Sequence, residues 1–139
     1  NFPLASFPVC SLMDARKSEV YAALFNCSGT FPSAQISDSV MPPGRLLDML
    51  RARAATPVIF CGDGAARYQN LIADHMEGQA IFAPFPLNIA HASNAIPLAL
   101  QALESRKALD PSRLLPVYLR ASEAEINRDL AAKSGHPTI

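Results

Sequence analysis

The feature that most constrains the fold is a short apolar run, Val58 to Cys61, that leads straight into Gly62-Asp63-Gly64 and then into a helical pattern. A continuous apolar run of this length predicts a strand buried on both faces, and the glycines allow the tight turn that follows. A strand, a tight turn and a helix in this order are typical of sheets covered by helices. We therefore expect an α/β fold.

Other segments extend this pattern. Two apolar stretches, Val9 to Met13 and Val20 to Phe25, flank the charged sequence DARKSE and predict a hairpin. Further on, PPGRLLDMLRARAA predicts a helix and QAIFA predicts a short strand. Residues 26–43 are rich in Ser, Pro, Gly and Thr, so we expect at most one short edge strand there, near Ala34 to Ser37. Together the segments predict a mixed sheet with an N-terminal hairpin and flanking helices.

The apolar stretch of residues 88–105 is rich in Ala and Leu and predicts a further helix. Pro97 lies inside the stretch, so the helix must kink or restart there. Because charged residues are nearly absent up to Leu103, we expect this helix to be buried on most sides.

Length and composition fit one globular domain, residues 1–139. Twelve Lys and Arg balance twelve Asp and Glu, so the chain has no basic field of its own for nucleic acid. Three cysteines without a CxxC pair indicate neither a disulfide framework nor a zinc ribbon. A reducing, cytoplasmic setting fits this cysteine usage best.

The sequence shows no membrane segment. Its apolar runs fall short of the roughly eighteen residues that a membrane helix needs, and its first residues lack the pattern of a signal peptide. The chain begins with Asn1 rather than methionine, so we expect a processed or excised piece of a longer protein.

The first candidate site is the turn Gly62, Asp63 and Gly64. Backbone N–H groups and the helix dipole at such a turn can hold a phosphate, which makes it a candidate nucleotide-facing turn. The structural alternative is that the glycines make a tight turn and Asp63 caps the helix. The motif is short, and the structural alternative is the commoner use of these residue types.

The second candidate site is the charged opening cluster with Asp14, Arg16 and Glu19. One interpretation is a solvated turn that closes the hairpin, which composition alone favours. The other is a working loop at the end of a strand. For Tyr118 and Arg120 one interpretation is a recognition surface, and the other, which fits equally well, is plain alternation along a half-buried strand with both side chains outside. They lie in PVYLR, which predicts a half-buried strand with Val117 and Leu119 inside.

Catalytic and metal motifs are incomplete. The sequence HMEG, His75 to Gly78, contains two ligand types, but HExxH needs a second histidine where this chain has Gln79. A helix that ends near Gly78 is the plain alternative. The GxSxG pattern of a nucleophile elbow is absent. We therefore assign no catalytic and no metal-binding residues.

Three segments in order, MDARKSEVYAALF, VIFCGDGAARY and LLPVYLRASEAE, resemble the C-terminal lobe of the TsaB (YeaZ) family. These are the glycoprotease-like accessory proteins of bacterial tRNA threonylcarbamoyladenosine synthesis. The resemblance runs from about Val9 to about Glu125. It implies one lobe of an actin-like or RNase H-like ATPase fold, with the N-terminal lobe absent.

The resemblance also implies partners and a function. Family members support the catalytic paralogue TsaD, together with the ATPase TsaE, in threonylcarbamoyl transfer to the adenosine beside the anticodon. ATP and metal would then be held by the partner subunits, tRNA would be met only through the complex, and a homodimer is expected of the intact protein. In the family, the missing half carries much of the contact with TsaD.

In active members of the wider superfamily, the first hairpin of the second lobe carries a glycine-rich phosphate loop, because a side chain there would collide with the nucleotide. The corresponding turn here, Asp14-Ala15-Arg16, has no glycine. The resemblance thus implies a degenerate phosphate loop or a contact element, in which Arg16 pairs with Asp14 or Glu19 or reaches the absent lobe. Two alternatives stay open: a nucleotide-binding or phosphotransferase lobe that uses Gly62 to Gly64, and a metal-dependent, glycoprotease-like peptidase.

Overall fold

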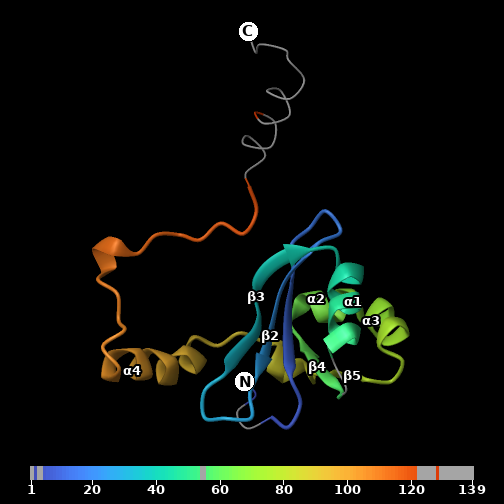
Figure 1. The fold of residues 1–139 in the computed structure, drawn as a ribbon, viewed down its shortest axis with the longest axis horizontal. Coiled ribbons are helices and arrows are strands. Elements are labelled where there is room, and N and C mark those ends of the chain that lie inside the picture. Colours follow the sequence, from blue (N-terminus) through green and yellow to red (C-terminus); the bar gives the residue numbers. More distant parts are fainter. Residues whose placement is uncertain (1, 3–4, 54–55, 122–127, 129–139) are drawn as a thin grey trace.

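A five-stranded mixed sheet forms the centre of the molecule (Figure 1). The computed structural model describes residues 2, 5–53, 56–121 and 128. The strands lie in the order β3-β2-β1-β4-β5. Their bounds are β1 (Val9–Asp14), β2 (Val20–Asn26), β3 (Ser33–Met41), β4 (Val58–Cys61) and β5 (Ala80–Phe82).

The pairing of the strands confirms the predicted hairpin and mixed sheet. Strand β2 runs antiparallel to both β1 and β3, with Leu12 opposite Ala22. Strands β1, β4 and β5 run parallel to one another, with Cys10 opposite Phe60. The carboxyl ends of β1 and β4 therefore meet at one edge of the sheet, which is where ligand sites of open α/β sheets form.

Three helices pack on one face of the sheet (Figure 1): α1 (Pro43–Arg53), α2 (Asp63–Arg67) and α3 (Gln69–Met76). Alternate strand residues face them, as the two-residue period of a strand requires. The core contains the following buried side chains: Cys10, Leu12, Val20, Ala22, Leu24, Ile36, Met41, Leu46, Leu47, Leu50, Val58, Phe60, Ala65, Ile72 and Met76. Full burial of each large apolar side chain stabilises the fold by about 1.5 to 3 kcal/mol.

The predicted short edge strand is wrong in length, because β3 has nine residues and is the longest strand. Polar residues hid it from the sequence, since an edge strand exposes most of its side chains. Only Ile36 and Met41 are buried, while Ser33, Gln35, Ser37 and Asp38 are exposed. The backbone pairing with β2, from Asn26–Ser33 to Val20–Met41, compensates for the weak apolar pattern.

The prediction of a buried helix at residues 88–105 is also wrong. Helix α4 (Ile96–Glu104) has Pro97 in its first turn, as a restart there requires, but its residues are exposed except for half-buried Ala102. It follows two short 3₁₀ turns, η1 (Phe85–Asn88) and η2 (Ala92–Ala95), and a third, η3 (Pro111–Arg113), comes after it. Residues 84–120 form an arm that leaves the sheet and later returns to it (Figure 1). Within the described residues, no helix is long and apolar enough to cross a membrane.

Candidate functional site

The two main candidate clusters of the sequence meet at the carboxyl ends of β1 and β4. Strand β1 ends at Asp14 and opens the hairpin turn, and β4 ends at Cys61, directly before Gly62. The backbone N–H of Asp14 donates a hydrogen bond to the Asp63 carboxylate at 3.2 Å. The hairpin turn and the Gly-Asp-Gly turn therefore form one site, although 49 residues separate the bonded pair.

The Asp14 carboxylate is the centre of this site. Its side chain is only 10% exposed and accepts the backbone N–H of Arg16 at 3.0 Å. It also pairs with two guanidinium groups, Arg16 at 3.5 Å and Arg67 at 3.2 Å. Two guanidinium groups and a backbone N–H therefore bind the carboxylate of Asp14, so the negative charge at the centre of the loop belongs to the protein itself.

The hairpin turn has an unusual backbone. Arg16, Lys17 and Ser18 all adopt positive φ angles, of 60°, 50° and 58°. Hydrogen bonds from Ala15 N–H to the Glu19 carbonyl and from Glu19 N–H to the Arg16 carbonyl close the turn. Each non-glycine residue in this left-handed region costs about 1 to 2 kcal/mol. Neighbouring contacts must offset that cost, and strain of this kind concentrates at contact and ligand sites.

The glycines of the second turn are explained by close packing. A Cβ atom on Gly62 would lie 2.1 Å from the Leu12 carbonyl oxygen, and one on Gly64 would lie 3.0 Å from Leu12. Gly62 also has φ of +98°. The Gly62 N–H donates to the Asn88 side-chain oxygen at 2.9 Å. The turn thus packs closely against the backbone of β1, which occupies the space that a side chain on Gly62 or Gly64 would need.

The predicted capping role of Asp63 is wrong. Gly62 is the N-cap residue of helix α2, so no side chain caps this end of the helix. Asp63 is the first residue of the helix, and its carboxylate accepts the Asp14 N–H instead. A carboxylate in the first helical turn is still favoured by the helix dipole.

Arg120 joins the site from the far end of the arm. Its guanidinium donates to the Ala15 carbonyl at 3.0 Å and forms an ion pair with Glu19. The predicted strand over residues 116–120 is absent from this described segment, and Val117 is exposed rather than inside. Arg120, expected outside, is instead three-quarters buried against the hairpin, whereas Tyr118 is 83% exposed. The hydrogen bond to Ala15 and the ion pair with Glu19 hold Arg120 against the hairpin, in place of the alternation that the sequence suggested.

Sequence reasoning missed two residues of the site. Arg67 pairs with Asp14, and its guanidinium lies 5.8 Å from the Tyr68 ring centroid. Asn88 accepts from Gly62 and donates to the Ala83 carbonyl at 3.2 Å. Arg67 follows Asp63 by four residues, so helical spacing could have placed it on the same face. Nothing in the local pattern around Asn88 marks it.

His75, the histidine of HMEG, contacts a carboxylate on the protein surface. His75 Nε2 lies 3.5 Å from the Asp48 carboxylate, so it links α3 to α1. The helix ends as predicted, since Glu77 is left-handed and Gly78 follows with φ of +84°. Among the described residues, no three His, Cys, Asp or Glu side chains are grouped so that they could hold a metal ion.

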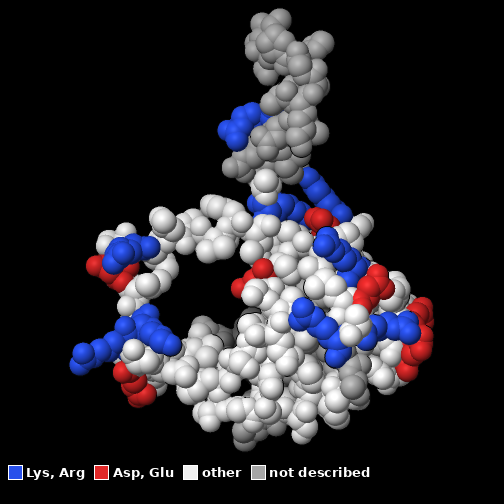
Figure 2. All heavy atoms as spheres, viewed as in Figure 1, with Lys and Arg blue, Asp and Glu red and all other residues white. Residues whose placement is uncertain are grey.

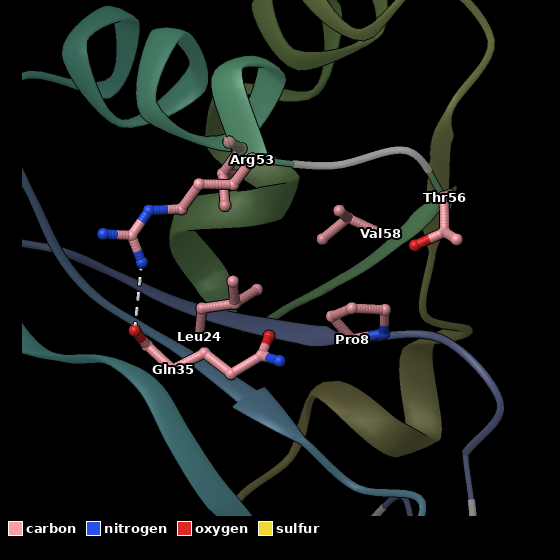
Figure 3. Close-up of a pocket in the computed structure, with 7 residues that line it drawn as sticks. Pro8, Leu24, Gln35, Arg53, Thr56 and Val58 are labelled. Carbon is pink, nitrogen blue, oxygen red and sulfur yellow. Dashed lines mark hydrogen bonds between the residues drawn. The ribbon is translucent and has the colours of Figure 1, made fainter.

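A hollow of about 390 Å³ lies at the opposite end of the sheet (Figure 3). Its lining residues are Pro8, Leu24, Gln35, Leu50, Arg53, Thr56 and Val58. Among its described lining residues Arg53 alone is charged, and its guanidinium donates to the Gln35 carbonyl at 3.1 Å. Because the hollow lies at the amino ends of β1 and β4, it is remote from the candidate site.

Comparisons with known proteins give the fold a family context. No protein-family model and no curated protein matches the chain. A solved structure described as an uncharacterized protein with similarity to peptidase YeaZ from Pseudomonas aeruginosa matches with a TM-score of 0.61 and 25% identity, over 81% of this chain and 49% of that one. YeaZ from Pseudomonas aeruginosa matches with a TM-score of 0.57 and 22% identity, over 80% of this chain and 49% of that one.

The sheet order and these matches define an α/β lobe of the actin-like, RNase H-like class. Within that class the similarity is to YeaZ, also called TsaB, and the family resemblance expected from the sequence is confirmed. The chain spans about half the length of the solved structures it matches. That this half is the C-terminal lobe stays a prediction.

Proposed function

We propose that the chain is one lobe of a non-catalytic accessory subunit that supports a TsaD-like enzyme. That enzyme would transfer a threonylcarbamoyl group to the tRNA adenosine beside the anticodon. The partners are the TsaD-like subunit and a TsaE-like ATPase, which hold the ATP and the metal, and the setting is cytoplasmic. The similarity to YeaZ supports the family, and the hairpin supports the non-catalytic role.

The observation that carries the proposal is the state of the hairpin turn. A phosphate loop needs open backbone N–H groups and small residues, so that an anion can approach. Here Asp14 places a carboxylate at the strand end, where it binds the Arg16 N–H and the Arg67 guanidinium, while the Asp14 N–H donates to the Asp63 carboxylate. A nucleotide phosphate would meet this negative charge, so the turn favours a contact role.

The outer side of the same turn suits a protein partner. The Arg16 side chain is 81% exposed, and Lys17 is exposed beside it. Figure 2 shows acidic and basic side chains mixed over the part of the surface near α1 and α3, without a single-sign field. Together with zero net charge, this favours contact with tRNA only through the complex.

Isothermal titration against a purified TsaD-like enzyme tests the proposal. We expect binding by the chain, or by the intact protein that carries both halves, and at least about tenfold weaker binding after Arg16→Glu. Arg45→Glu, an exposed charge reversal on α1, is the matched control and should leave the affinity unchanged. Absence of binding by both forms, or threonylcarbamoyl transfer by the intact protein without the enzyme, would contradict the proposal.

A further inference from the structure

The end of the arm docks on the hairpin through two adjacent residues, Leu119 and Arg120. Every residue from Leu103 to Ala121 is exposed except Arg120, which is half-buried. Leu119, 38% exposed, lines a hollow of about 240 Å³ together with Met13 and Tyr21 of the two hairpin strands. An apolar side chain therefore rests on the strands, and the charged side chain after it reaches the turn.

Arg120 bridges the two sides of the hairpin turn. Its Nη1 donates to the Ala15 carbonyl at 3.0 Å, and its Nη2 pairs with the Glu19 carboxylate. Ala15 precedes the three left-handed residues of the turn, and Glu19 follows them. The planar guanidinium presents its donors in a rigid fork, so one side chain can hold both acceptors at once. Arg120 thus ties the start of the turn to its end.

The peptide unit between Ala15 and Arg16 is held at both of its polar groups. Its carbonyl accepts from Arg120, and its N–H donates to the Asp14 carboxylate at 3.0 Å. Because a peptide unit is planar, these two contacts together fix its orientation, and that orientation determines φ of Arg16. This φ is 60°, in the left-handed region that costs energy for a residue with a Cβ atom. A contact from the end of the arm therefore supports the strained start of the turn.

The contact between arm and hairpin is small and partly open to solvent. The side chains of Arg120 and Glu19 are 24% and 31% exposed, so water and salt reach the ion pair. Docking also orders the long arm between Asn88 and Arg120, which costs chain entropy. Opening of such a contact does not require the sheet to unfold, because regions with few buried contacts open locally.

We infer that Leu119 and Arg120 form a reversible clasp that holds the hairpin turn in its left-handed shape. When the clasp opens, the Ala15 carbonyl and the Glu19 carboxylate lose their shared cation, and the turn relaxes toward a commoner backbone. The consequence for an enzyme partner rests on the proposed function, since the same turn carries the exposed side chain of Arg16. The clasp itself is a property of this chain alone.

Amide hydrogen exchange followed by NMR tests the clasp, with Ala15 and Glu19 as reporters because their N–H groups close the turn. Arg120→Ala should speed exchange of both amides about tenfold or more, as expected for loss of hydrogen bonds from a charged donor. Leu119→Ala should act in the same direction. The paired amides of β1 and β2 should exchange as in the wild type. Arg113→Ala, at an exposed arginine of the same arm, is the matched control and should change neither reporter.

Two further measurements separate the clasp from a general loss of stability. Arg120→Ala combined with Glu19→Gln should exchange no faster than Arg120→Ala alone, because the two side chains form one ion pair. Raising NaCl from about 50 to about 500 mM should speed exchange of the reporters more in the wild type than in Arg120→Ala. Unchanged reporter amides in Arg120→Ala overturn the inference, as do an equal salt effect in both proteins and faster exchange throughout the sheet. No enzyme is present in these experiments, so their outcome is independent of the proposed function.

Discussion

The Asp14 carboxylate lies 3.2 Å from Nη1 of Arg67, and the pair joins the end of the first strand to the first helix after the fourth strand. Asp14 is nearly buried, whereas the Arg67 side chain is 54% exposed. Solvent therefore screens the cation more than the anion. The pair fixes the position of the hairpin turn relative to the Gly-Asp-Gly turn, more than it adds to total stability.

A double-mutant cycle with Asp14→Ala and Arg67→Ala measures this link. We expect Asp14→Ala to lower the free energy of unfolding by about 1 to 3 kcal/mol, because a nearly buried acceptor of several hydrogen bonds is lost. Arg67→Ala should cost about 0.5 to 1 kcal/mol, as for a half-exposed ion pair. Urea denaturation provides the energies. A coupling energy near zero would show that the two side chains act independently.

The close approach of the second turn to β1 predicts a large effect at Gly62. Gly62→Ala should destabilise the fold by about 2 to 4 kcal/mol, because its Cβ meets the Leu12 carbonyl and its φ is positive. Gly44→Ala is the matched control, since a Cβ on Gly44, in helix α1, has open space around it. That control should be neutral or stabilising by up to about 1 kcal/mol. Equal effects at the two positions would contradict the packing argument.

Elements with their own local pattern were predictable from the sequence. The hairpin, helix α1 and the unit of β4 with its following turn each combine an apolar period with turn residues. The meeting of Asp14 with Asp63 was not predictable, because it depends on the parallel pairing of β1 with β4. Arg120 reaches the hairpin across 101 residues, and no local pattern encodes such a contact.

The arm shows where composition misleads. An uncharged Ala- and Leu-rich segment predicts burial only if another element of the same chain lies over it. Helix α4 has the composition of a buried helix, yet its anchors at Asn88 and Arg120 hold it away from the sheet. Composition alone therefore could not predict its exposure, which depends on where the two anchors hold the arm.

The left-handed hairpin turn predicts that glycine improves stability there. Ser18→Gly should raise the free energy of unfolding by about 0.5 to 1 kcal/mol, because glycine adopts positive φ without the Cβ penalty and only part of that gain is lost to chain entropy. Ser18→Ala, the control, keeps the Cβ and should change little. Thermal and urea unfolding of the three proteins measure the differences. A loss of stability in Ser18→Gly would show that the turn is not strained.

The buried thiol of Cys10 predicts a dependence of stability on alkaline pH. Burial, and secondarily the neighbouring Cys61, raises the pKa of Cys10 from its ordinary value of 9.0 to about 12. Above the ordinary value the unfolded chain loses this proton while the folded chain keeps it. The contribution of Cys10 is therefore fully present below about pH 9 and decreases as the pH rises toward about 12.

The measurement is the free energy of unfolding of the wild type minus that of Cys10→Ala, determined by urea denaturation at several pH values from about 8 to about 11. Subtraction removes the titration of Lys and Tyr, which both proteins share. We expect the difference to decrease as the pH rises, because only the wild type contains the buried thiol. The Cys10 thiol should also resist a thiol reagent at pH 8 in the folded chain and react in urea, since its thiolate is the nucleophile. A difference that is independent of pH, with rapid labelling of the folded protein, would contradict burial of Cys10 in the core.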